Sequence, residues 1–273
     1  MAHDGSITRE TRPEPGAPGG CPSAIASMRG RAQRVLIASL CAVAIGGLTP
    51  RAHADSSTID FETPTYTIGS INGQDGWSAT GPYDFGVAAT APFGSPAGFA
   101  AQSFRISNAV TSGSFGDWAF SKSLVDEAGE PTADNAGFSG GTRQPHFEVS
   151  FDIASTVPGA EQPGLQISVA PDRGDGARMS FLKFRDTPGG IDVDFADYQD
   201  LPPFGSPSDL PDGCGTEDDF FLTTVATGLS RLVPHHIRLV IDFVPGTRND
   251  VVRVFVDGVL VHCGTTWEDY YRY

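Results

Sequence analysis

The sequence has almost no helical pattern and few basic side chains. Its apolar residues alternate with polar ones instead of recurring at every third and fourth position, and 33 glycines and 21 prolines interrupt the chain. Lys and Arg number 18 against 33 Asp and Glu, a formal net charge of −15. A surface this acidic repels nucleic acid and anionic membranes, and it is compatible with divalent cations and neutral glycans. We therefore predict an all-β protein with no nucleic-acid partner.

The chain also lacks the run of about 20 apolar residues that a membrane-spanning helix needs. Its most apolar stretch, residues 35–48, follows a basic segment at 28–34 and precedes the small-x-small sequence Ala-His-Ala at 52–54. This is the pattern of a secretory signal peptide. We predict that residues 28–54 are cleaved and that the protein is secreted, extracellular or at the cell surface. An uncleaved anchor is the alternative.

The domain organisation follows from this leader. Residues 1–27 are rich in Pro, Gly and charge, and we expect them to be disordered, as a start-site extension upstream of Met28. Residues 55–273 suit one β-sandwich domain. Nothing after residue 262 reads as the strand that would pair with the first strand of such a sandwich, so we expect the domain to be truncated at its C-terminus.

Cysteine is scarce in the predicted mature chain, where two residues remain, Cys214 and Cys263. An even number of cysteines in an exported protein favours a disulfide. Pairing would close a loop of about 50 residues, which stabilises the fold by roughly 3–4 kcal/mol through the entropy of the unfolded chain.

Alternating patterns predict strands over most of the chain. The clearest are 236–244, 250–256 and 259–262, with Asp257-Gly258 as the tight turn of the last hairpin. Further strands are predicted at 146–154, 165–169, 179–184, 191–195 and 220–226, and shorter ones at 58–61, 66–71 and 103–107. The dense apolar run at 179–184 predicts a central strand. Together these strands predict an antiparallel sandwich of two sheets.

Two of these features resemble a known superfamily. The strand, Asp257-Gly258, strand pattern resembles the laminin-G-like domains and the concanavalin A-like lectin/glucanase sandwiches, most strongly over residues 146–267. The stretch from Ile71 to Trp77 is similar to the opening of bacterial exported sandwiches of this class, where Trp closes one end of the core. The resemblance implies a jelly-roll fold and a glycan or polysaccharide as partner, often with Ca²⁺.

Glutamate is too sparse for the hydrolases of this fold. They carry a Glu-x-Asp-x-Glu or Glu-x-Asp-x-x-Glu strand that supplies the two carboxylates of glycoside hydrolysis. None of the seven glutamates after residue 54 begins such a pattern, although Glu148 and Asp152 share one strand face. Gly137-Phe-Ser-Gly-Gly141 lacks the strand and helix of a nucleophile elbow. No catalytic residue is predicted.

Three aspartates are the candidates for a metal. Asp192, Asp194 and Asp197 offer the hard oxygen ligands that Ca²⁺ prefers, and a solvated polar face is the alternative. His235 and His236 are adjacent, so on a strand they point to opposite faces and cannot share one metal.

Aromatic side chains are the candidates for stacking on sugar rings. We expect Trp118, Trp267, Tyr270 and Tyr271 to contact carbohydrate, with packing as the alternative, and Trp77 to lie in the core. The leading prediction is a secreted, non-catalytic, lectin-like carbohydrate-binding module. The alternatives are a polysaccharide hydrolase or lyase on the same fold, and a structural or adhesive cell-surface protein.

Overall fold

The computed structural model describes residues 56–90, 99–113, 116–122, 145–171, 180–198, 220–244 and 249–267. Regular structure in these ranges consists of strands β1 to β13 without a helix. Every strand pair is antiparallel. The all-β prediction is therefore confirmed. All of these strands lie in the unit His53–Tyr273, and the predicted leader falls outside the described residues.

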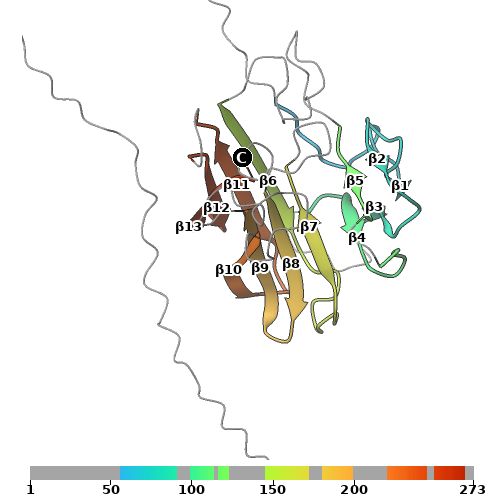
Figure 1. Ribbon diagram of the computed structural model, residues 1–273. Coiled ribbons are helices and arrows are strands. Elements are labelled where there is room, and N and C mark those ends of the chain that lie inside the picture. Colours follow the sequence, from blue (N-terminus) through green and yellow to red (C-terminus); the bar gives the residue numbers. More distant parts are fainter. Residues whose placement is uncertain are drawn as a thin grey trace, which may run out of the picture. The chain divides into compact units, whose positions relative to one another are not determined.

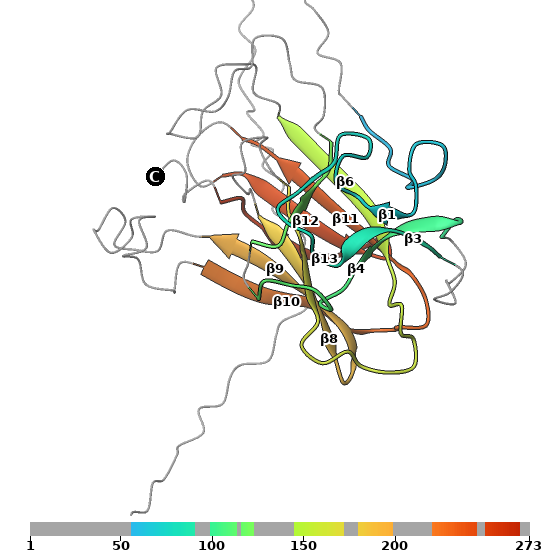
Figure 2. The ribbon, with the colours of Figure 1, turned by 90° about the vertical axis from the view of Figure 1, so that its right-hand side faces the viewer.

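Two four-stranded sheets make up most of the fold (Figures 1 and 2). The first, called here the β7–β10 sheet, has the order β10-β9-β8-β7 and contains Phe220–Leu229, Gly190–Tyr198, Phe181–Thr187 and Gln166–Val169. The second, called here the β11 sheet, has the order β13-β12-β11-β6 and contains Val259–Gly264, Val251–Val256, His235–Asp242 and His146–Ile153. Of these eight strands, β6 comes first in the sequence and lies in the β11 sheet. β7 to β10 then form the other sheet, and β11 to β13 complete the β11 sheet.

A single apolar core joins the two sheets. Along β12, Val252 and Val254 are fully buried, while Arg253 between them is partly exposed. Leu182 and Phe195 of the β7–β10 sheet belong to the same cluster of buried side chains as Val254 and the apolar residues of β11. Each such buried side chain stabilises the fold by roughly 1.5–3 kcal/mol. The shared core makes this pair of sheets sandwich-like, as alternation with period two predicts.

The last hairpin matches its prediction closely. Asp257 and Gly258 have φ angles of 51° and 79°, the positive values that a two-residue turn of type I′ requires at both central positions. The Asp257 amide donates to the His236 carbonyl at 2.8 Å, which ties the turn to β11. The predicted central strand at 179–184 is also confirmed, because β8 lies between β7 and β9.

The N-terminal strands form two small sheets. β3 (Phe85–Ala89) lies between β1 (Gly69–Ser70) and β4 (Gln102–Ile106), and β2 (Ser78–Ala79) pairs with β5 (Ala119–Phe120). Their core contains buried Tyr66 and Ile71, with aromatic rings packed around them. Trp77 belongs to this core, as predicted, with its ring 5.2 Å from that of Phe104.

Prediction was weakest in this region. The strand predicted at 58–61 is wrong, because these residues form no strand and Phe61 has a φ of 61°, which breaks an extended chain. The strand predicted at 66–71 is reduced to Gly69–Ser70. β3 was not predicted, because its sequence, Phe-Gly-Val-Ala-Ala, has little polar alternation.

Candidate functional site

The outer face of the β11 sheet carries a group of paired charges. Alternation sends every second side chain of β6, β11 and β12 away from the core, and on this face charged side chains lie beside Val240 and Phe255. Asp242 lies opposite His146, and Val240 lies between Glu148 and Arg253. We call the group His146, Glu148, Arg238, Asp242 and Arg253 the charged face.

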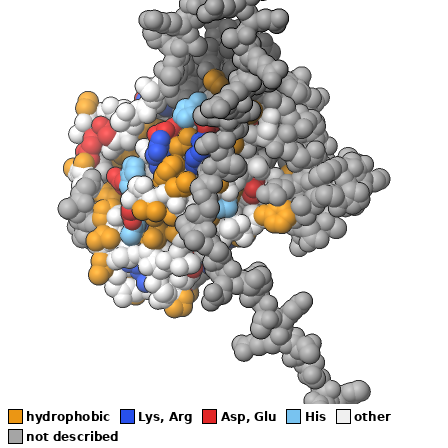
Figure 3. Space-filling model, turned by 90° about the vertical axis from the view of Figure 1, so that its left-hand side faces the viewer, with side chains coloured by type: hydrophobic (Ala, Val, Ile, Leu, Met, Phe, Trp, Pro, Cys, Tyr) orange, Lys and Arg blue, Asp and Glu red, His pale blue; other side chains and the backbone are white. Residues whose placement is uncertain are grey.

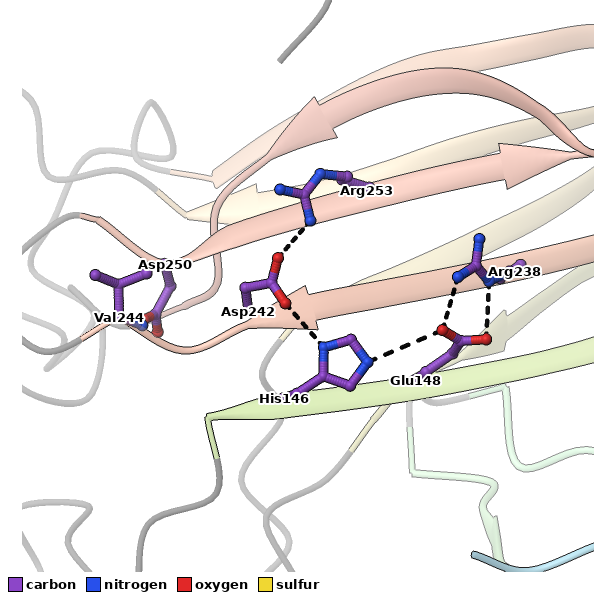
Figure 4. Close-up of polar contacts among 7 residues, drawn as sticks. All are labelled: His146, Glu148, Arg238, Asp242, Val244, Asp250 and Arg253. Atoms are coloured by element: carbon purple, nitrogen blue, oxygen red, sulfur yellow. Dashed lines mark hydrogen bonds and ion pairs between the residues drawn. The ribbon is translucent and has the colours of Figure 1, made fainter. Parts of the chain in front are cut away.

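Hydrogen bonds hold the side chains of the charged face in fixed positions (Figure 4). Arg238 forms a bidentate ion pair with Glu148, in which Nε donates to Oε1 and Nη2 donates to Oε2, both at 2.8 Å. His146 Nδ1 lies 2.8 Å from Asp242 Oδ1, and Arg253 Nη1 donates to Asp242 Oδ2. His146 Nε2 lies 3.9 Å from Glu148 Oε2, so the histidine links the two pairs.

Both carboxylates of the charged face are stabilised in their ionised form. The hydrogen bonds from Arg238 lower the pKa of Glu148 and outweigh the effect of burial, which raises it. Hydrogen bonds from Arg253 and then His146 lower the pKa of Asp242 in the same way. Neither carboxyl therefore holds a proton at neutral pH.

The charged face is open to solvent. The side chains of Glu148 and Arg238 are each 39% exposed. Figure 3 views the molecule from the side of β12 and β13 and shows basic, acidic and histidine side chains gathered around a small hydrophobic area. The Arg238 guanidinium also lies over the Phe255 ring, 4.9 Å from its centroid, which limits its movement.

The aspartates predicted to bind calcium are divided between two faces of β9. Asp192 and Asp194 share the outer face, as predicted. Asp194 is buried and accepts hydrogen bonds from Arg185 Nε at 2.5 Å, Arg185 Nη2 at 2.9 Å and Thr224 Oγ1 at 2.7 Å. Burial raises the pKa of Asp194, but these hydrogen bonds outweigh it and the net pKa is lowered. Asp194 is thus an ion-pair residue rather than part of a solvated face.

The Asp197 side chain lies on the opposite face of β9 from those of Asp192 and Asp194. Its Oδ1 accepts a hydrogen bond from Thr265 Oγ1 at 2.8 Å, and Asp192 accepts one from the Gly228 amide at 2.9 Å. No group of three or more metal-ligating side chains occurs among the residues that the structure describes. Calcium binding by the three aspartates stays a prediction without support from this geometry.

The predicted stacking aromatics lie in different surroundings. Trp267 is buried, packs against Phe181, and donates from Nε1 to the Ala196 carbonyl at 3.2 Å. Trp118 is half-buried beside Phe120, with ring centroids 5.5 Å apart. Tyr270 and Tyr271 fall outside the described residues. Trp118 and Trp267, the two that the structure describes, therefore pack against different aromatic residues.

Two further sequence predictions concern single residues. His235 is buried and its neighbour His236 is exposed, so they point to opposite faces, as predicted. The sulfur of Cys263 is disulfide-bonded. Cys214 lies outside the described residues, so its pairing with Cys263 stays a prediction.

The sequence contained one signal for the charged face that we did not use. Polar residues alternate with apolar ones along β6, and Arg238, Asp242 and Arg253 interrupt the mostly apolar sequences of β11 and β12. Glu148 was considered only with Asp152, which instead pairs with His236 at 2.8 Å.

Comparisons with known proteins do not add a family. No family model matches the chain, and neither the curated proteins nor the solved structures that were searched contain a similar one. The resemblance to concanavalin A-like and laminin-G-like domains therefore stays a prediction. In the described part of the chain, no helix is long and apolar enough to cross a membrane.

Proposed function

We propose that this chain is a secreted, non-catalytic carbohydrate-binding protein on a jelly-roll sandwich of the concanavalin A-like kind, and that the charged face binds the glycan. The observation that carries the proposal is the row of fixed, exposed hydrogen-bonding groups on the β11 sheet. The signal-peptide pattern of residues 28–54 supports secretion.

The chemistry of the charged face suits sugar hydroxyl groups. Each hydroxyl is both a donor and an acceptor, and this face offers carboxylate acceptors beside guanidinium donors. Because Arg238 and Glu148 already hold each other in place, a ligand would bind without ordering these long side chains. Such preorganisation raises affinity by lowering the entropic cost of binding.

The lowered pKa values support binding over hydrolysis at this face. Glycoside hydrolysis needs one carboxyl with a raised pKa, so that it can protonate the leaving oxygen. Glu148 and Asp242 have lowered pKa values instead, because each is paired with an arginine. Loss of Arg238 or Arg253 would be required before either carboxyl could act as a general acid.

A glycan array tests the proposal. The protein is expressed with its own leader, purified in processed form, and screened with calcium and with a calcium chelator. We expect one family of glycans to bind, and we expect Glu148→Gln to weaken that binding because it removes an ionised acceptor. Glu161→Gln, between β6 and β7, is the matched control.

Three outcomes would count against the proposal. If no glycan on the array binds, the proposed carbohydrate-binding function is refuted. Equal binding by the Glu148→Gln and Glu161→Gln variants would move the site away from the charged face. Release of reducing or unsaturated sugar ends from a bound polysaccharide would show a hydrolase or lyase. Calcium-dependent binding would instead direct attention to the predicted aspartates.

A further inference from the structure

The formal charges of the charged face cancel within the face itself. It contains two carboxylates, Glu148 and Asp242, and two guanidinium groups, Arg238 and Arg253, while His146 adds charge only when it is protonated. This balance differs from the chain as a whole, which carries a net charge of −15. These five residues therefore carry no net charge on an acidic protein when His146 is neutral, and Asp152 and His236 lie on the same sheet face.

Each charge on this face also has a partner already. A charged ligand that took the hydrogen-bonding positions already used within a pair would displace one member of that pair, and the other member would then lose its counter-charge. For example, a ligand carboxylate that accepted hydrogen bonds from Nε and Nη2 of Arg238 would leave Glu148 beside a second negative charge. Binding of an ionic ligand therefore has a cost that the existing pairs impose.

An uncharged hydroxyl group meets no such cost. A carboxylate has about four acceptor positions, and a guanidinium has five N–H donors. The pair between Arg238 and Glu148 uses one hydrogen bond to each carboxylate oxygen and leaves the Nη1 donors outside the pair. Sugar hydroxyls can use the remaining positions while both ion pairs stay intact.

We propose, building on the proposed carbohydrate-binding function, that the charged face selects uncharged glycans and rejects uronate and sulfate polymers. The paired charges of the face supply this selectivity, and the net negative charge of the protein adds to the rejection of polyanions.

Salt dependence separates the classes of ligand. Dextran, galactomannan and xylan serve as neutral polymers, polygalacturonate and heparin as polyanions, and chitosan as a polycation, each in affinity electrophoresis with the processed protein. We expect a neutral polymer to bind with an affinity that changes less than about twofold between roughly 50 and 500 mM NaCl, because screening acts on charged ligands.

Other results would overturn the selectivity. Binding to polyanions or to chitosan alone, weakened strongly by salt, would refute it and leave the carbohydrate-binding function standing. Absence of binding to all six polymers would refute the carbohydrate-binding function as well.

A charge-balance series of variants tests the cause. Glu148→Gln leaves Arg238 without a counter-charge, and we expect an affinity for polygalacturonate at least about tenfold above wild type, with strong salt dependence. The double variant Glu148→Gln with Arg238→Gln restores neutrality and should return polygalacturonate binding to the wild-type level. Glu161→Gln should leave it unchanged. No gain in the single variant, with an unaltered urea unfolding midpoint, would refute the inference.

Discussion

The buried pair between Arg185 and Asp194 makes the clearest stability prediction. Substitution Arg185→Met keeps most of the side-chain volume and removes the charge. The Asp194 side chain is only 1% exposed, so the substitution leaves a buried carboxylate with Thr224 as its main remaining donor. Removing one partner of a buried pair costs about 3–5 kcal/mol. We expect the lower end, about 3 kcal/mol, because Arg185 is itself 30% exposed.

The protein contains a matched control for this variant. Arg105 is 29% exposed, nearly the same as Arg185, but its partner Asp84 is also 29% exposed. Pairs that water reaches contribute about 0–1 kcal/mol, so Arg105→Met should cost at most about 1 kcal/mol. Urea unfolding followed by tryptophan fluorescence measures both variants. If both lose the same free energy of unfolding, burial of Asp194 does not determine the cost and the reasoning fails.

Acidification gives a second test of the same pair. In the wild type the pKa of Asp194 is lowered, so its contribution is complete above the unfolded pKa of about 4 and is lost as the pH falls through the folded pKa. In Arg185→Met, burial acts without the arginine and raises the pKa, so protonation relieves the buried charge. The difference in unfolding free energy between the two proteins should therefore shrink as the pH is lowered from 7 towards about 4. A constant difference would contradict this explanation.

Two further predictions concern a tight turn and the charged face. Gly190→Ala should destabilise the fold by about 1–3 kcal/mol in urea unfolding, because φ is 137° and a Cβ would lie 2.5 Å from the Leu229 carbonyl oxygen. Gly159→Ala, which meets nothing within 4 Å, should not, and equal effects would refute the argument. In a His146→Asn variant, which lacks the histidine whose charge depends on protonation, glycan binding measured by calorimetry should stay constant from pH 8 to about pH 5, because Glu148 and Asp242 have lowered pKa values and stay ionised. Loss of binding above pH 5 would refute that assignment.

Strand prediction succeeded where alternation and turn chemistry agree. β6 and β12 have regular alternation, and Asp257-Gly258 supplies the positive φ angles that fix the last hairpin. The N-terminal strands have two to five residues, and glycine or alanine occupies many of their positions. Short strands of small residues leave no periodic signal, so their pairing depends on contacts between distant parts of the chain.

The charged face was harder to predict because strand register determines it. Glu148 and Arg238 are 90 residues apart in the sequence, and they meet only because β6 and β11 pair antiparallel with Val240 opposite Glu148. A shift of one residue in that register would send Arg238 into the core and remove the pair. The sequence shows that polar residues alternate on each strand, but it does not show which of them become neighbours.

The same limitation explains the reading of the acidic residues on β9. Considered along one strand, Asp192 and Asp194 look like two oxygen ligands on one face that need a cation. The cation that the fold provides is Arg185 on β8, which lies opposite Asp192 and hydrogen-bonds to Asp194. A metal site and an internal ion pair produce the same spacing of carboxylates on a single strand, and the neighbouring strand distinguishes them. Both sheets use arginine as the counter-charge, and a ligand can reach the exposed Glu148 carboxylate but not the buried carboxylate of Asp194.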